Sequence, residues 1–297
     1  MTTVTCVGLA VQDFVFSLPE RLIEGEKNFA GGLASSGGGP AATAAVAASR
    51  LGADARLVSV VGSDLVGDAV IAELEAHGVG CTGVRRVDAP TSMSAVLVAA
   101  DGERTIINRT DPFLWSQAAT PTVEDLAASD VVLVDVRWPE GAMAAIDVAG
   151  RLGIPTVVDC DATDEPVSED LLAGADTIIF AESAMGPHGL KPNAKGVQTA
   201  AARWDAVAAV TKGSEGVIWS DGTNGGAMPA FSVAAIDTLG AGDVFHGAFA
   251  AATALAYARA DAFEFASAAA AIRCARGQGR DGIPTRNEVE AFLEANK

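Results

Sequence analysis

The chain has 297 residues, of which 49% are hydrophobic and only 5% are aromatic. This is the composition of a globular protein with many small apolar side chains, and it excludes an intrinsically disordered chain. Lysine and arginine number 20 against 38 aspartates and glutamates, and the resulting net charge of −18 argues against nucleic acid or an anionic membrane as the main partner.

The cysteines and the apolar segments bear on the compartment. Cys6, Cys81, Cys160 and Cys274 lie far apart and match no metal-site or redox spacing, so we expect reduced thiols. The N-terminal segment lacks a basic stretch and resembles a first strand more than a signal peptide. No apolar run reaches membrane-spanning length without interruption. We therefore expect a soluble, cytoplasmic protein without a membrane partner.

Strands and helices are predicted to alternate along most of the chain. The expected strands are 3–11, 55–61, 131–136, 156–159, 177–180, 206–211 and 216–220, the last of them hairpin-like. The expected helices are 40–51, 67–77, 142–152, 169–173, the segment after Asp243, 262–276 and 286–295. Continuously apolar strands belong inside a parallel sheet that is covered on both faces. The prediction is one α/β domain over residues 1–297, with a Rossmann-like, mostly parallel sheet and helices on both faces.

Two segments, at about 13–34 and 90–110, interrupt this alternation. They contain strand-like pieces without intervening helices, such as SMSAVLVAA and ERTIIN. This pattern predicts a small separate sheet. We expect it to act as a lid over the active site, with an edge hairpin or a dimerisation sheet as the alternatives.

The segment Asp237 to Asp243 reads DTLGAGD and leads directly into the apolar run VFHGAFAAATALAYA. A glycine-rich turn at a helix start can hold a phosphate, because the first backbone amides of a helix point outward and are unpaired. An aspartate in that turn could take the proton from an attacking alcohol, which predicts phosphoryl transfer. The alternative is that Asp243 merely caps the helix.

Further motifs occur in order along the chain. GGGPAAT spans residues 37–43, and RLGA, TKGSEG (residues 211–216) and GIPTR follow it. Together with DTLGAGDVFHGAFA, this series resembles the ribokinase, or PfkB, family of carbohydrate kinases over nearly the whole chain. The resemblance implies a ribokinase-like fold with a β-sheet lid, ATP and Mg²⁺ as cofactors, a small sugar as substrate, and a homodimer formed through the lid sheet.

The resemblance also implies roles for individual residues. Asp243 matches the general base, and the backbone amides of Gly240, Ala241 and Gly242 match the anion hole for the transferred phosphoryl group. The positions that match the nucleotide-binding residues are Thr211, Gly213, Gly216 and Thr238. Those that match the residues binding sugar hydroxyls are Asp13, Gly38 and Gly39.

Two departures from the family pattern concern the sugar and the metal. Thr43 stands where many relatives have an asparagine after the glycine turn, which predicts a sugar pocket unlike that of an ordinary ribokinase. The NxxE motif that organises the waters of magnesium is missing, and Glu182 is the candidate substitute. A monovalent cation near Asp237 and the loop 279–284 occurs in parts of the family.

Three polar residues point to an anionic sugar. Lys27 lies in the expected lid, Asn108 ends the strand ERTIIN, and Arg137 follows a buried strand. These residues, with GGGPAATAAVAA, GERTIIN and DVRW, resemble the sulfofructose kinase branch, in which a lysine, an asparagine and an arginine bind the sulfonate. The reaction implied is ATP-dependent phosphorylation of the 1-hydroxyl of 6-deoxy-6-sulfofructose.

Other functions remain open at this point. A family kinase of a neutral or phosphorylated sugar, such as fructose, ribose, tagatose 6-phosphate or ketodeoxygluconate, or of a nucleoside, is the first alternative. A non-catalytic sugar- or nucleotide-binding regulatory protein is the second. A dinucleotide-dependent oxidoreductase is excluded because no GxGxxG follows the first strand. His246, one turn into the helix after Asp243, is expected to pack or to donate to a backbone carbonyl.

Overall fold

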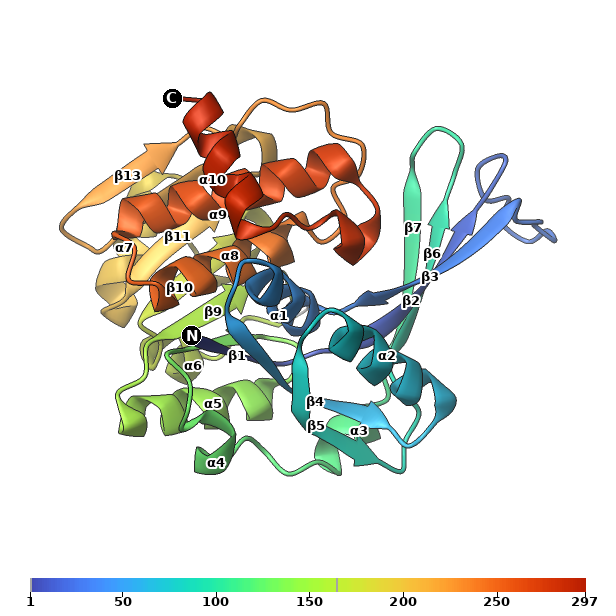
Figure 1. Ribbon diagram of the computed structural model, residues 1–297, viewed down its shortest axis with the longest axis horizontal. Coiled ribbons are helices and arrows are strands. Elements are labelled where there is room, and N and C mark those ends of the chain that lie inside the picture. The colour runs from blue at the N-terminus through green and yellow to red at the C-terminus, as the bar shows by residue number, and fades with distance from the viewer. Residues whose placement is uncertain (1, 164) are drawn as a thin grey trace.

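The computed structural model describes residues 2–163 and 165–297. A nine-stranded sheet forms the centre of this part of the chain (Figure 1). In spatial order its strands are β13 (Gly225–Met228), β12 (Val217–Ser220), β11 (Val207–Thr211), β10 (Thr177–Ala181), β9 (Thr156–Cys160), β8 (Val131–Asp135), β1 (Thr3–Val7), β4 (Asp54–Gly62) and β5 (Gly80–Val87). The strands from β11 to β5 run parallel, whereas β12 and β13 are antiparallel to their neighbours. The carboxyl ends of the parallel strands meet at one edge, where open α/β sheets bind ligands.

Helices cover both faces of this sheet and enclose one apolar core on each. The helices on one face are α1 (Pro40–Arg50), α2 (Leu65–Ala76), α8 (Ala241–Ala254), α9 (Arg259–Arg276) and α10 (Arg286–Ala295). Those packed on the other core are α3 (Pro112–Ser116), α4 (Val123–Leu126), α5 (Pro139–Leu152), α6 (Glu169–Ala173) and α7 (Ala194–Trp204). The predicted fold class is confirmed.

Small side chains allow α1 and α8 to pack very closely. Every residue of α1 from Ala41 to Ala48 is buried. A Cβ atom built on Gly247 of α8 would lie 2.3 Å from the carbonyl oxygen of Ala44, so only glycine fits at this contact. The backbones of the two helices therefore touch directly.

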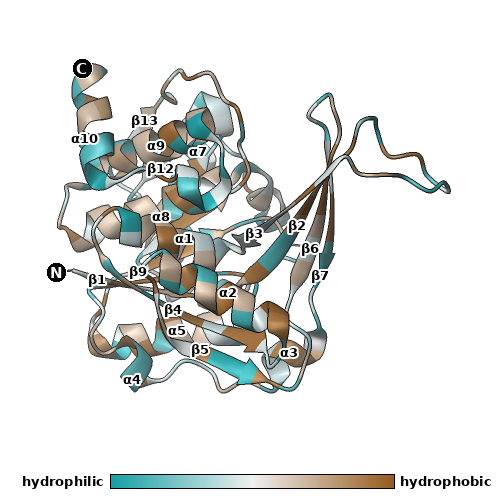
Figure 2. Cartoon of the chain, turned by 45° about the vertical axis from the view of Figure 1, so that its right-hand side comes forward, coloured by the Kyte–Doolittle hydropathy of each residue, from teal (hydrophilic) through white to brown (hydrophobic). Residues whose placement is uncertain are grey.

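A second, four-stranded sheet stands away from the large one (Figures 1 and 2). Its order is β3 (Gly32–Gly38), β2 (Val11–Ser17), β6 (Met93–Val98) and β7 (Arg104–Arg109). The strand β2 pairs antiparallel with β3 and parallel with β6, and β7 is antiparallel to β6. These strands fall in the two segments expected to form a separate sheet, although β3 continues beyond residue 34 to Gly38.

Three sequence predictions were wrong in detail. The expected first strand 3–11 is interrupted after Val7, because Gly8 turns the chain with a φ of 149° and its Cα lies against the carboxylate of Asp135. Residues from Val11 onward then belong to the small sheet. The edge strand β5 was missed because its sequence, GCTGVRRV, has glycines and charges where apolar alternation was sought. The helix α7 was missed although Asn193 caps it by accepting from the amide of Gly196.

Two further expectations concern the cysteines and the membrane. All four cysteines are free, and Cys6 and Cys160 are buried. Within residues 2–163 and 165–297, no helix has both the length and the apolar character needed to cross a bilayer.

Candidate active site

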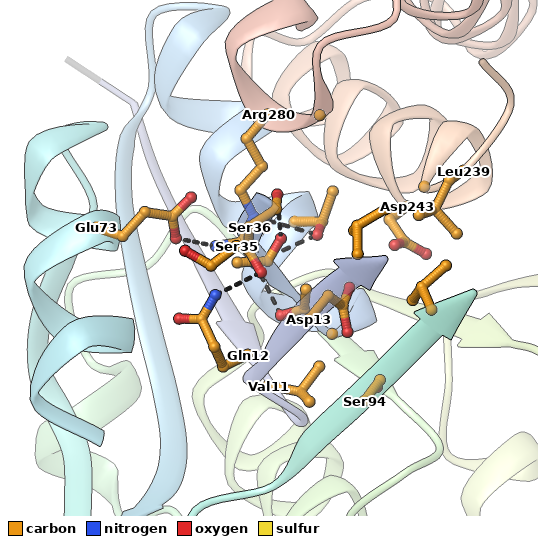
Figure 3. A pocket seen from close by; sticks show the side chains of 18 of the residues that line it. Val11, Gln12, Asp13, Ser35, Ser36, Glu73, Ser94, Leu239, Asp243 and Arg280 are labelled. Carbon is orange, nitrogen blue, oxygen red and sulfur yellow. Dashed lines mark hydrogen bonds and ion pairs between the residues drawn. The ribbon is translucent and has the colours of Figure 1, made fainter. Parts of the chain in front are cut away.

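A cleft of about 1330 Å³ lies between the small sheet and the edge of the large sheet at which the parallel strands end. The small sheet, the start of α1, α2, the loop before α8 and the short helix η4 (Gly279–Gly282) all contribute to its lining. Figure 3 shows Asp13, Asp243 and Arg280 pointing toward the same space from β2, α8 and η4. Segments at both ends of the chain therefore meet in one site.

Asp243 occupies the first turn of α8. The residue that caps this helix is Gly240, in the left-handed conformation with a φ of 73°, and the cap has no side-chain hydrogen bond. The preceding loop is fixed by Asp237, which accepts from the amide of Leu239 at 3.0 Å and from Arg273 at 2.9 Å. The capping alternative for Asp243 is therefore wrong, and its carboxyl group is available to the cleft that it lines.

The environment of Asp243 suits a group that exchanges protons. Burial, and secondly the nearby carboxylate of Asp159, raise the pKa of Asp243 to about 7. A general base works best when its pKa lies close to the working pH. Asp243 can thus hold or release a proton near neutrality.

Asp13 shares one face of the small sheet with other polar residues. In the strand register, Asp13 pairs with Ser36 and Ser94, and Ser94 pairs with Asn108. Residues paired across a sheet project to the same face, and all four line the cleft. Burial raises the pKa of Asp13, while a hydrogen bond from Ser94 and the charge of Arg280 oppose that shift.

The glycine turn before α1 lies against Asp13. A Cβ on Gly38 would lie 2.2 Å from a carboxylate oxygen of Asp13, and Gly39 has a φ of 93° with the carbonyl oxygen of Leu9 close by. Neither position accepts a side chain without displacement. The predicted sugar residues Asp13, Gly38 and Gly39 are thus brought together in the cleft.

Arg280 is a site residue that the sequence reasoning missed. Its guanidinium is buried; Nη1 pairs with Glu73, Nη2 donates to the carbonyl oxygen of Gly38 at 2.8 Å, and both Nε and Nη2 lie within 3.4 Å of Thr43 Oγ1. These partners of Arg280 are more than 200 residues away in sequence, so a local sequence pattern cannot predict the contacts. The one available hint was an arginine inside the glycine-rich segment that precedes GIPTR.

Two of the three proposed anion-binding residues reach the cleft. Asn108 lines it from β7, and Arg137 lines it from the end of β8, where Arg137 forms an ion pair with Asp161. The backbone amide of Arg137 donates to Asp135 at 2.9 Å, which fixes this turn. Lys27 lies exposed in the connection between β2 and β3 and is not among the residues that line the cleft.

The predicted nucleotide residues lie outside this lining. Thr211 ends β11 and donates to the carbonyl oxygen of Phe180 at 3.3 Å. Gly213 begins the short helix η3 (Gly213–Glu215) and Gly216 follows it, at the same edge of the sheet, and both glycines have positive φ. Glu182 begins the short helix η1 (Glu182–Ala184) directly after β10, and Thr238 lines a separate recess of about 330 Å³ beside Glu103.

Comparison with known proteins shows the family to which the chain belongs. The chain matches the pfkB family carbohydrate kinases over residues 1–286. It is 30% identical over 296 residues to the ribokinase of Bacillus subtilis (strain 168), covering 99% of this chain and 100% of that one. It is 32% identical over 264 residues to the ATP-dependent ribose-1-phosphate kinase of Halopiger xanaduensis, covering 87% and 86% of the two chains.

A solved structure gives the same result. The crystal structure of a protein from Agrobacterium tumefaciens, assigned as a ribokinase, superposes with a TM-score of 0.93 at 34% sequence identity, covering 99% of this chain and 98% of that one. The chain therefore belongs to the pfkB family of carbohydrate kinases, enzymes that transfer a phosphoryl group to an alcohol.

Proposed function

We propose that this enzyme transfers the γ-phosphoryl group of ATP to a hydroxyl of a small anionic sugar, with the 1-hydroxyl of 6-deoxy-6-sulfofructose as the leading candidate. The observation that carries the proposal is that Arg137 and Asn108 line the same cleft as Asp13 and Asp243. A guanidinium offers a planar fork of donors that suits an oxyanion, and the amide of Asn108 adds a further donor.

The chemistry assigned to the cleft is a single displacement. Asp243 takes the proton of the sugar hydroxyl as the oxygen attacks the γ-phosphorus, and the bond to ADP breaks. The backbone amides of Gly240, Ala241 and Gly242 stabilise the charge on the transferred group. Asp13 and the glycine turn hold the sugar through its other hydroxyls. Closure of the small sheet over the cleft would exclude water.

The nucleotide is assigned to the loop of Thr211, Gly213 and Gly216, with Thr238 close to the phosphates. Two features of the loop support this. Apart from its two chain neighbours, no atom of the described residues lies within 4 Å of a Cβ built on Gly213, which leaves room for a ligand. A Cβ on Gly216 would lie 2.0 Å from the carbonyl oxygen of Met228. Only a glycine permits that close turn.

Magnesium would be held mainly by phosphate oxygens and water. Among residues 2–163 and 165–297 no three His, Cys, Asp or Glu side chains form a metal-binding group, and Mg²⁺ commonly needs only one or two carboxylates beside the phosphates. Glu182, at the end of β10, remains our candidate, acting through water. We propose no monovalent-cation site at Asp237, because Arg273 already contacts its carboxylate at 2.9 Å.

A second candidate is ribose or ribose 1-phosphate. It is favoured by the names of the two relatives, a ribokinase and a ribose-1-phosphate kinase. The position of Lys27 outside the cleft lining also favours it, because this residue could contact a sulfonate only if the connection between β2 and β3 moved inward.

A coupled assay of ADP release distinguishes the candidates. We would compare 6-deoxy-6-sulfofructose, fructose 6-phosphate, tagatose 6-phosphate, fructose, ribose, ribose 1-phosphate and ketodeoxygluconate. The Arg137→Ala variant should raise KM for an anionic sugar much more than for a neutral one, whereas Arg151→Ala, at an exposed pair on α5, should change neither. Equal effects of Arg137→Ala on both sugar classes would reject the anionic substrate.

We also propose a cytoplasmic homodimer. The face of the small sheet that points away from the cleft carries Leu33 and Ile107, which are 63% and 57% exposed. Leu33 pairs with Phe16 across the sheet, and the strand register places Ile107 on the same face. An apolar sheet face of this kind is a typical contact surface. Four free thiols and the use of ATP fit the cytoplasm.

A further inference from the structure

A buried histidine and a buried aspartate lie directly behind Asp243. His246 is three residues further along α8 and therefore on the same side of the helix. Its Nδ1 lies 3.2 Å from Oδ2 of Asp159, in β9, and the two side chains are only 5% and 3% exposed. His246 was expected to pack or to donate to a backbone carbonyl, and the backbone at Gly242 and Ile179 does act on it, but it also faces a buried carboxylate.

Asp159 differs from the other carboxylates near the base. Asp135 accepts hydrogen bonds from the amides of Leu9, Ala41 and Arg137, and Asp161 pairs with the side chain of Arg137. Oδ2 of Asp159 is buried, and among the described residues it has no hydrogen-bond partner apart from the imidazole that faces it. A carboxylate that is buried without compensation is strongly unfavourable, so Asp159 needs either a proton or a charged partner.

We propose that Asp159 and His246 share one proton at the pH at which the enzyme works, and that this neutral pair keeps Asp243 free to act as an anionic base. Whether the proton is on the imidazole or on the carboxyl group, the pair carries no net charge. Without that proton, a second negative charge would lie beside Asp243 and hold the proton of the base more tightly. His246 is therefore a positioning residue that acts through Asp243, and this inference rests on the proposed role of Asp243.

The electrostatics of the surrounding groups are consistent with such a pair. Burial raises the pKa of Asp159 well above its usual value, with Asp135 and Asp161 adding to the shift and Arg137 opposing it. Burial lowers the pKa of His246, while the charges of Asp243 and Asp161 and the backbone at Gly242 and Ile179 act to raise it. On the cleft side, Arg280 is the cationic group that interacts with Asp243. One proton shared between Asp159 and His246 satisfies both tendencies.

The first test is the pH profile of kcat/KM, measured with ATP and with 6-deoxy-6-sulfofructose or ribose, whichever is turned over faster. In His246→Asn, the proton that the pair held must be shared by the carboxyl groups of Asp159 and Asp243, so less of the enzyme has an anionic base. The acid limb should move to higher pH, and a shift of one pH unit lowers kcat/KM on that limb about tenfold. The double variant His246→Asn/Asp159→Asn removes the competing carboxyl group and should return the limb close to that of the unmodified enzyme.

A second measurement needs no substrate. In His246→Asn, the proton is left to the carboxyl groups of Asp159 and Asp243, and because the folded-state pKa of Asp159 lies above its unfolded value of about 3.9, the stability that this proton contributes is lost as the pH rises. The Tm of this variant should therefore fall between about pH 5 and about pH 6.5. In the unmodified protein, His246 binds a proton in the unfolded chain over this range. The pair therefore binds about as many protons folded as unfolded, and it contributes little to the slope of Tm against pH. The double variant His246→Asn/Asp159→Asn should not show this additional fall of Tm with pH.

His188→Asn is the matched control. His188 is also a buried histidine facing a carboxylate, with its Nδ1 3.5 Å from Glu169, but it packs against Trp204 and Phe180 in the core on the other face of the sheet. This substitution should leave the acid limb unchanged. An unmoved acid limb in His246→Asn, or a double variant that keeps the shift, would overturn the proposal. Retained turnover in Asp243→Asn would instead refute the base itself, and the Tm result would still report on the pair.

Discussion

Arg280 donates to the carbonyl oxygen of Gly38 at 2.8 Å, which joins a segment near the end of the chain to the glycine turn that leads into α1. The same guanidinium pairs with Glu73 on α2 and lies close to the hydroxyl of Thr43. Arg280 and Thr43 both line the cleft, so together they form the part of it beside the glycine turn.

Replacing Arg280 by glutamine should therefore affect sugar binding first. The variant loses the bond that fixes Gly38 and leaves Glu73 without its cation, so we expect KM for the sugar to rise at least several-fold with little change in KM for ATP. Removing one partner of a buried ion pair costs about 3 kcal/mol. Urea unfolding would measure this loss. Arg276→Gln, at a more exposed pair with Glu288, is the control and should change neither quantity much. Equal increases in both KM values would contradict this role for Arg280.

The Asp243→Asn variant should keep ATP binding and lose most turnover. Loss of a general base lowers kcat about 10²- to 10⁴-fold, which the coupled assay of ADP release would measure. Calorimetric titration with ATP would serve as the binding control. Turnover close to that of the unmodified enzyme would remove Asp243 from the mechanism.

The pH dependence of activity and of stability should follow the carboxyl group of Asp243. Its pKa in the folded protein is raised to about 7, so kcat/KM should rise with pH through that value as the base ionises. The unfolded pKa is about 3.9, so the raised pKa stabilises the folded protein fully below about pH 3.9, and this contribution is lost as the pH rises through 7. Asp243→Asn removes this loss, so the Tm of the variant should rise relative to that of the unmodified protein from acid to neutral pH. A constant difference in Tm would contradict the raised pKa.

Gly38→Ala should disturb Asp13 by steric contact. The added methyl group would lie 2.2 Å from a carboxylate oxygen of Asp13, so the side chain of Asp13 has to move away from its place in the cleft. We expect a higher KM for the sugar and a modest fall in Tm. At Gly150, within α5, a new methyl group would meet no atom of the described residues within 4 Å beyond its own helix backbone. Gly150→Ala should therefore leave KM unchanged and raise Tm slightly. An unchanged KM in Gly38→Ala would argue against Asp13 as a sugar ligand.

The proposed dimer predicts an effect of charge on the outer face of the small sheet. Ile107→Lys places a cation on the same exposed sheet face as Leu33, at the opposite edge strand, and should shift the protein from dimer to monomer. Light scattering after size-exclusion chromatography measures this directly. Leu65→Lys, at a residue 85% exposed at the start of α2, tests whether any added lysine has the same effect. If the unmodified chain is already monomeric at micromolar concentration, the proposed dimer is wrong.

The sequence predicted the parts of the fold that depend on local patterns. The apolar strands and the small-residue helices on both faces were expected, and Asp243 was singled out because its glycine turn and helix start are adjacent in the chain. The edge strand β5 and the helix α7 were missed because their local signals are weak. Arg280 and the pair of His246 and Asp159 were missed because each depends on contacts between distant segments, which only packing creates.

The direct backbone contact between α1 and α8 has a consequence for how the enzyme can change. The turn holding Gly38 and Gly39 leads into α1, and the turn holding Gly240 and Asp243 leads into α8, so the contact of Gly247 with Ala44 joins the two turns as one rigid unit. The distance between the glycine turn and the base then does not depend on β6 and β7, the strands of the small sheet that contribute to neither turn. Substitutions on β6 and β7 can therefore alter substrate preference while the geometry of phosphoryl transfer is retained.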